Sequence, residues 1–129
     1  MNTEEKDRAK NQARAQLDSI IEMVTALDTE DDEAREEAMQ TIQDDPLSVL
    51  VRSDWCDPGE EKLVPHEFEI LLCTGGPACR ILGELDEHRE PDRAWLEYQD
   101  WGTPWTPFFL TADESEAVLR YCQQFYFGN

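Results

Sequence analysis

The chain has 129 residues and carries 30 acidic against 11 basic side chains, a formal net charge of -19. This length favours one domain, residues 1–129, with a single modest core. Both parts of the chain are acidic, since residues 1–45 hold 14 acids and 5 bases and residues 46–129 hold 16 acids and 6 bases. Such a surface repels nucleic acid and anionic membranes and attracts basic partners, although acidity can also serve solubility alone.

The front of the chain has helical spacing. Apolar side chains recur every three or four positions between residues 4 and 27, which predicts one helix with the stripe Ala9, Ala13, Leu17, Ile20, Ile21, Val24 and Leu27. The polar first half of this helix is expected to fray or project. Thr29 is the expected N-cap of a second helix that ends near Gln43, before Asp45-Pro46. The two helices predict an acidic helical hairpin over residues 1–45.

After Pro46 the apolar period changes to two, which indicates strands. Turn-forming residues separate four such segments, at residues 47–52, Glu67–Cys73, Arg80–Leu85 and Arg93–Gln99. Their short connections favour an antiparallel meander over residues 46–110. Thr111-Ala112-Asp113-Glu114 is a capping box that begins a last helix, about 112–126, within residues 111–129. The expected fold is α+β: a helical hairpin, a four-stranded antiparallel sheet and a C-terminal helix.

The cysteines favour a reducing compartment, and the hydropathy shows no segment that would cross a membrane. Four cysteines are present, and neither they nor the two histidines follow a zinc-binding spacing (Cys56, Cys73, Cys79, Cys122). Cys73 and Cys79 flank a turn and could face each other across a hairpin. No signal peptide is evident, and no apolar run approaches the roughly 20 residues that span a bilayer. We expect a cytoplasmic protein without metal or other cofactor.

Two short motifs have a catalytic and a structural interpretation. Residues 74–77, Thr-Gly-Gly-Pro, could cradle an anion, but a predicted strand follows instead of a helix, which favours a hairpin turn. His66, Glu97 and Asp100 could act as general acids or bases, or the acids could pair with arginines. Nucleophile and metalloprotease motifs are absent from the sequence, so the chain is not expected to be an enzyme.

The segment Glu97–Thr106 concentrates three aromatic residues beside glycine and proline. It belongs to a larger aromatic cluster: Trp95, Trp101, Trp105, Phe108 and Phe109. In so small a domain we expect most of these rings in the core, with Trp101 or Trp105 able to present an edge to a partner.

Six acids fall within about two helical turns: Glu30, Asp31, Asp32, Glu33, Glu36 and Glu37. A charge run of this kind often forms only a solvated helix face. Here the apolar stripe of the helix is thin, and carboxylates on successive turns approximate the spacing of phosphates along a nucleic-acid strand. The six acids are therefore candidate contacts for a basic partner, with Trp101 or Trp105 as a possible anchor.

Three segments together resemble a known group of sequences. Residues 45–53 (DPLSVxVRS), 68–78 (FEILLCTGGPA) and 97–106 (EYQDWGTPWT) are similar to small proteins of bacteriophages, prophages and mobile elements. The resemblance covers about residues 45–107 and carries no catalytic residues. Among phage proteins, small and very acidic chains resemble anti-restriction and anti-CRISPR inhibitors, some of which mimic DNA.

The leading hypothesis is an inhibitor that occupies a basic surface of a host protein or ribonucleoprotein in the bacterial cytoplasm. RNA-guided effectors hold nucleic acid in positively charged channels of this kind. The hypothesis involves neither direct nucleic-acid binding nor a membrane, and it leaves the oligomeric state open. One alternative is a phage accessory or scaffold protein with incidental acidity. A second is a small hydrolase or nucleotide-binding enzyme.

Overall fold

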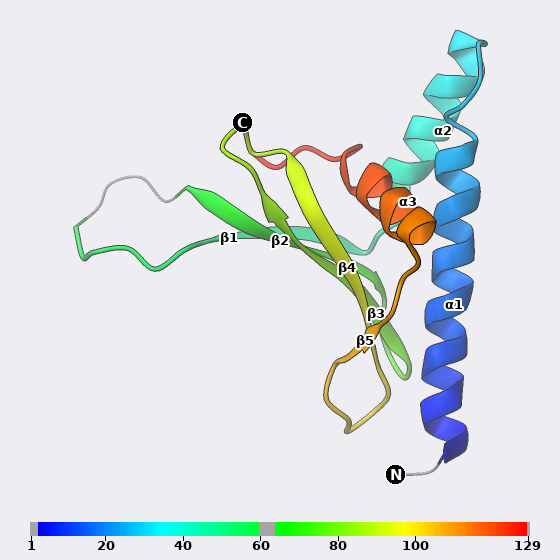
Figure 1. The fold of residues 1–129 in the computed structure, drawn as a ribbon, viewed down its shortest axis with the longest axis vertical. Helices are drawn as coiled ribbons and strands as arrows, with labels where there is room; N and C mark the ends of the chain where they lie inside the picture. Colours follow the sequence, from blue (N-terminus) through cyan, green and yellow to red (C-terminus); the bar gives the residue numbers. More distant parts are fainter. Residues whose placement is uncertain (1–2, 60–63, 129) are drawn as a thin grey trace.

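The computed structural model describes residues 3–59 and 64–128, which form an α+β fold of three helices and an antiparallel sheet (Figure 1). In chain order the elements are α1 (Thr3–Thr25), α2 (Asp32–Asp44), β1 (Ser48–Ser53), β2 (Pro65–Cys73), β3 (Ala78–Leu85), β4 (Pro91–Gln99), β5 (Thr106–Phe108) and α3 (Ala112–Cys122). The helical, strand and helical regions follow one another as the change in apolar period predicts.

The sheet is a simple meander whose spatial order β1-β2-β3-β4-β5 equals the chain order. All neighbouring strands are antiparallel, as their short connections predict. Ile70 of β2 lies opposite Val49 on one side and Ile81 on the other, and Ile81 lies opposite Leu96. This register places one row of apolar side chains across the same face.

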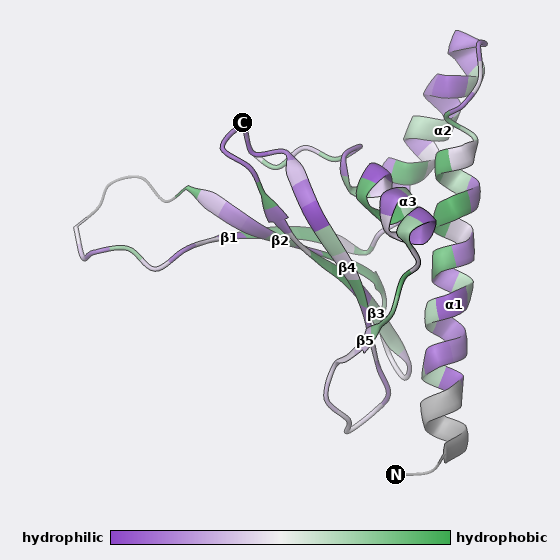
Figure 2. Cartoon of the chain, viewed as in Figure 1, coloured by the Kyte–Doolittle hydropathy of each residue, from purple (hydrophilic) through white to green (hydrophobic). Residues whose placement is uncertain are grey.

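The helices cover that apolar face over β3 and β4. Both α1 and α3 contact β4, and α1 also contacts β3 and runs along α3. Figure 2 shows hydrophobic residues along the inner strands and hydrophilic residues on the outer part of α2. The core therefore lies between the sheet and the pair α1 and α3, while α2 packs against α1.

The predicted apolar stripe of α1 is buried along nearly its whole length. Six of its seven members are buried and Ile21 is half-buried. From Ala9 onward the expectation that the first half of the helix frays or projects is wrong, since Ala9 is 1% and Ala13 is 0% exposed. The side chains of residues 4–7 lie outside the described part of the chain. The small side chains of these alanines let α1 lie close to its neighbours. The polar composition of this part of the helix gave no sign of that contact.

Three helix boundaries differ from the prediction, and the first is the end of α1, at Thr25 instead of residue 27. Asp31, and not Thr29, is the N-cap of α2, because its carboxylate accepts a hydrogen bond from the Glu33 amide. At the other end of the chain, α3 has the predicted capping box but ends at Cys122. Phe125 lies beyond the end of α3 but still packs against the core. Its apolar side chain continues the helical spacing of the sequence, which is why the predicted helix was too long.

The sheet has one strand more than the four predicted. β5 is only three residues long and contains Pro107, so it lacks the alternation that identifies longer strands. It pairs with β4 between Leu96 and Tyr98 and forms one edge of the sheet. β1 forms the other edge.

Candidate protein-binding surfaces

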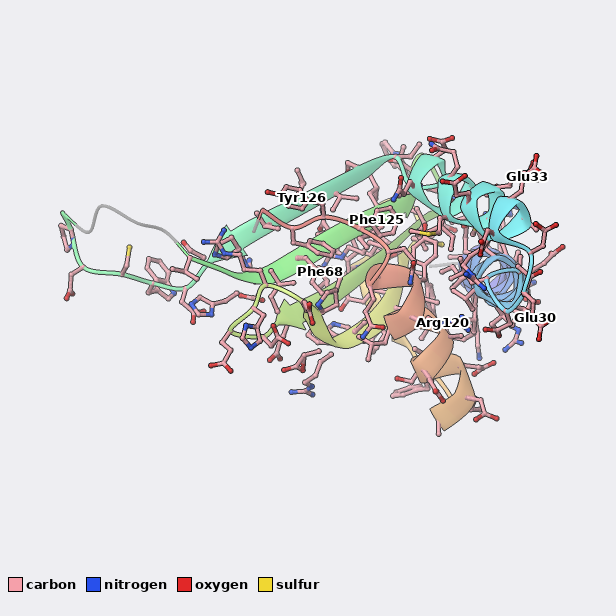
Figure 3. All side chains as sticks on the ribbon, turned by 90° about the horizontal axis from the view of Figure 1, so that it is seen from above. Glu30, Glu33, Phe68, Arg120, Phe125 and Tyr126 are labelled. Carbon is pink, nitrogen blue, oxygen red and sulfur yellow. The ribbon has the colours of Figure 1, made fainter. Side chains whose placement is uncertain are left out.

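The six predicted contact acids lie together at the start of α2. We call Glu30, Asp31, Asp32, Glu33, Glu36 and Glu37 the acidic patch, and all six are exposed. Helical geometry puts Glu33, Glu36 and Glu37 on one side of α2, opposite the buried residues Ala38 and Ile42. Figure 3 shows Glu30 and Glu33 pointing outward at the end of the molecule where α2 begins.

Two acids of the patch have structural roles. Asp31 caps α2, with its Oδ1 at 3.0 Å from the Glu33 amide nitrogen. Asp32 accepts a hydrogen bond from Arg35 at 3.3 Å, and Arg35 also donates to the carbonyl of Thr29. Arg35 thus ties the preceding turn to the helix while neutralising one acid of the patch.

The remaining four acids carry no such role. Within the described chain, the side chains of Glu30, Glu33, Glu36 and Glu37 make neither a hydrogen bond nor an ion pair with another residue. We call these four the free glutamates. Their charges are uncompensated in the fold and accessible from solvent, as the carboxylates of a binding surface must be.

Acids on either side of the patch instead hold the helices together. Arg120 of α3 donates to both oxygens of Asp28, at 2.7 and 3.1 Å, and the guanidinium lowers the pKa of that carboxyl. The hydroxyl of Tyr121 donates to Asp45 at 2.8 Å. These contacts fix both ends of the α2 segment to α3, so the acidic patch projects from a supported element.

A second surface is the side of the sheet that the helices leave uncovered, which we call the open sheet face. Its centre is Arg80, which bonds Glu69 at 2.8 Å and Glu97 at 2.8–2.9 Å. The Trp105 ring lies over the guanidinium, 4.0 Å from the arginine Cζ to the ring centroid. A pairing of Glu97 with an arginine was one of the two interpretations of that acid, whereas the contacts of Arg80 with Glu69 and Trp105 were not predicted. Alternation within the strands places Glu69, Arg80 and Glu97 on one face.

The other arginines of the open sheet face are also paired. Arg52 donates to both oxygens of Glu67, at 2.9 and 3.1 Å, and lowers the pKa of that carboxyl. Arg93 lies 3.4 Å from Glu84. Arg52, Glu67 and Arg80 are among the residues that line a shallow groove of about 300 Å³ over β1 to β3. Because the charges of the open sheet face pair with one another, a partner would meet a groove and apolar side chains there more than net charge.

The aromatic cluster does not behave as predicted. Trp101 and Phe109 are 85% and 89% exposed, while Trp95, Trp105 and Phe108 are half-buried. The expectation that most of these rings lie in the core is therefore wrong. Trp101 lies in the connection between β4 and β5, and Phe109 directly follows β5, so these two rings lie outside the paired strands.

The predicted binding residues do not form one site. The loop that carries Trp101 and Trp105 joins β4 to β5 near the N-terminal half of α1, whereas α2 lies beside the opposite end of α1 (Figure 1). The two tryptophans therefore cannot anchor a small epitope that also includes the acidic patch. Trp105 belongs instead to the Arg80 cluster.

The candidate acid–base residues also lie apart. Glu97 is on the open sheet face with Arg80, in agreement with the structural interpretation. Asp100 follows the far end of β4, where its Oδ1 accepts from the Trp101 amide and its Oδ2 has no partner among the described residues. His66 starts β2 at the opposite end of the sheet, 3.6 Å from Asp54. The three do not converge on one reacting atom.

The glycine-rich motif and the cysteines also have structural positions. Residues 74–77 form the turn between β2 and β3, with Gly75 at a φ of 101°. Cys73 and Cys79 lie opposite each other as predicted and are free thiols. Among the described residues, no group of three His, Cys, Asp or Glu side chains could hold a metal ion. None of the described helices has the length and apolar character needed to cross a membrane.

Comparison of the chain with protein families, with curated proteins and with solved structures finds no match.

Proposed function

We propose that the protein is an acidic inhibitor that binds through the acidic patch to a basic surface of a nucleic-acid-handling protein or ribonucleoprotein. The observation that carries the proposal is the set of free glutamates on a supported helix. Glu33 lies about one helical turn before Glu36 and Glu37, and Glu30 lies just before the helix begins. One turn is about 5.4 Å along the axis, which is comparable to the spacing of phosphates along a strand. A groove that holds phosphates with Arg and Lys would accept them in the same way.

The proposal is one of binding and not of catalysis. A partner groove whose residues neutralise the free glutamates would be closed to its own nucleic acid, so occupancy alone would inhibit. A bacterial cytoplasm and a phage or mobile-element setting are part of the same proposal. They rest on the resemblance of residues 45–107.

The test replaces Glu30, Glu33, Glu36 and Glu37 by Gln. The variant leaves the Asp31 cap and the Asp32–Arg35 pair intact, so the fold should persist. If each desolvated pair contributes about 1 kcal/mol or more, the variant should bind a basic partner about a thousandfold more weakly. The matched control replaces Glu87, Glu90, Asp92 and Glu116 by their amides, which removes the same charge from other exposed positions.

Both variants and the unmodified protein are immobilised and exposed to bacterial lysate, and bound proteins are eluted with rising salt. We expect a nucleic-acid-binding protein that is displaced by excess duplex DNA or RNA and is released by salt. The unmodified protein and the control variant should retain it, and the variant without the free glutamates should not. Equal retention by both variants would place the contact elsewhere than α2. Retention of a phage structural protein, insensitive to salt, would favour the scaffold alternative.

A further inference from the structure

The exposed apolar side chains of the molecule concentrate along one edge of the sheet. Nine large hydrophobic residues are exposed among those described, and four of them lie in β1 or beside its ends: Leu47, Leu50, Val51 and Trp55. A fifth, Val64, directly precedes β2, whose first residue pairs with the last residue of β1. Leu50 is 57% exposed and Trp55 fully exposed. β1 is also an edge strand, so alternate backbone N–H and C=O groups of it have no partner in the sheet. In Figure 3 β1 forms one outer margin of the sheet.

This edge lacks the features that normally keep edge strands from pairing. β1 contains no proline and is six residues long, and its only charge is that of Arg52. Its irregularity lies at the end, between Arg52 and Ser53, so Ser48–Arg52 is a regular template. By contrast, β5 at the opposite edge is three residues long and contains Pro107.

We infer that β1 is an interface at which a second copy of this chain adds its own β1, antiparallel, across a twofold axis. The pattern of the strand is self-complementary in a register centred on Leu50. On the open sheet face, Leu50 then lies opposite Leu50 of the second copy. On the other face, the twofold axis generates two identical pairs, in each of which Val49 of one copy lies opposite Val51 of the other. Each apolar side chain thus meets an apolar one, which is what an isologous interface requires.

Charge also favours a second copy at this edge. Residues 46–53 contain no acid and one arginine, in a chain of net charge -19. Two copies repel each other over most of their surfaces, and β1 is a segment where they can approach without opposing carboxylates. Asp45 and Asp54 lie at the two ends of the interface, so screening by salt should strengthen the dimer. A contact between the acidic patch and a basic partner would respond to salt in the opposite way.

The first test is the mass of the full chain in solution, by light scattering after size exclusion, at low and high sodium chloride. We expect twice the mass of one chain, with the dimer favoured by salt. Leu50→Lys should give a monomer, because it sets two ammonium groups against each other at the twofold axis. The matched control is Phe109→Lys, which puts the same charge on a residue exposed elsewhere and should leave the dimer intact.

The second test examines the register. Opposing residues of an antiparallel pair have Cα atoms about 4.5–5.5 Å apart, within the range of a disulfide. In a Cys56→Ser background, Leu50→Cys should therefore form an intermolecular disulfide when oxidised glutathione accepts the two electrons and is released as two glutathione thiols. Phe109→Cys in the same background should not.

Three results would overturn the inference: a monomeric unmodified protein at both salt concentrations, a Leu50→Lys variant that remains dimeric, or equal cross-linking at the two positions. The acidic patch lies on α2, so neutralising the free glutamates should leave the dimer in place. The inference and the proposed function can therefore fail separately.

Discussion

Gly83 lies in the middle of β3 because the Phe68 ring occupies the space of a side chain. A Cβ atom at Gly83 would collide with Cζ of Phe68 and with the carbonyl oxygen of Arg93. The ring cannot withdraw freely, since it packs on Phe127 with 4.9 Å between the centroids. One glycine thus determines how closely the tail of the chain packs on the sheet.

Gly83→Ala should lower the free energy of unfolding by about 1–3 kcal/mol, the usual cost of overpacking a core. Urea denaturation would measure this. Gly76→Ala is the matched control, because the nearest atom to its added methyl group would be Asp100 Oδ1 at 3.5 Å, an ordinary contact. Equal losses in the two variants would show that the collision with Phe68 is not what destabilises Gly83→Ala.

The second prediction at the scale of residues concerns two buried groups that can lose a proton, a thiol and a phenol. Burial raises the pKa of the Cys122 thiol, and burial with the Asp45 contact raises the pKa of the Tyr121 hydroxyl. The folded state therefore holds these protons more tightly than the unfolded state does. Their contribution is fully present below the unfolded pKa values, about 8.5 for Cys and about 10 for Tyr, and is lost as pH rises above them.

The free energy of unfolding should consequently fall above about pH 9, by up to about 1.4 kcal/mol per pH unit for each ionising group. Urea denaturation at several pH values would measure the slope. In Cys122→Ala the slope just above pH 9 should be shallower, because one titrating group is gone. A stability that stays constant between about pH 8 and 11 would contradict the burial of these groups.

At the scale of elements, α2 combines acids with two different roles. Asp31 caps the helix, whereas Glu36 lies exposed in its middle without a partner among the described residues. Asp31→Ala should therefore cost about 1 kcal/mol of stability. Glu36→Ala, which removes the same charge, should change stability by no more than about 0.5 kcal/mol. Thermal unfolding of the two variants checks this, and the reverse order would show that Asp31 does not cap the helix in solution.

Elements with a long, regular apolar period could be predicted from the sequence. The α1 stripe, the α3 capping box and the four longer strands were all identifiable for this reason. β5 was missed because three residues show no period, and α3 was predicted too long because Phe125 continues the apolar spacing beyond the helix. Cap choice between Thr29 and Asp31 depends on local geometry that residue type alone does not determine.

The candidate surfaces were less predictable than the elements. The exposure of the acidic patch followed from helix periodicity, but its separation from Trp101 and Trp105 depends on tertiary packing. The exposed β1 edge could not be predicted, because it depends on which strand the chain order leaves outermost and on how far the helices extend across the sheet. Partner identity depends on a second molecule and stays a prediction.

At the scale of the whole molecule, the charges are distributed unequally. Each arginine of the open sheet face, Arg52, Arg80 and Arg93, lies against a glutamate. The free glutamates have no such compensation. Net charge far from zero destabilises a compact state through self-repulsion. In this protein the free glutamates should contribute to that repulsion.

Sodium chloride should therefore raise the melting temperature. The screening length shortens from about 30 Å at 0.01 M to about 3 Å at 1 M, so long-range repulsion is lost first. Half-buried contacts such as Arg80–Glu97 are screened less.

The Leu50→Lys variant is the protein to measure, because salt-induced association at β1 would otherwise stabilise the fold by mass action. Replacing the free glutamates by Gln in that background should raise the melting temperature at low salt and reduce its rise with salt. A melting temperature that falls as salt is added would mean that surface ion pairs outweigh self-repulsion. The free glutamates would then not destabilise the unbound protein, and a basic partner would relieve no repulsion by binding them.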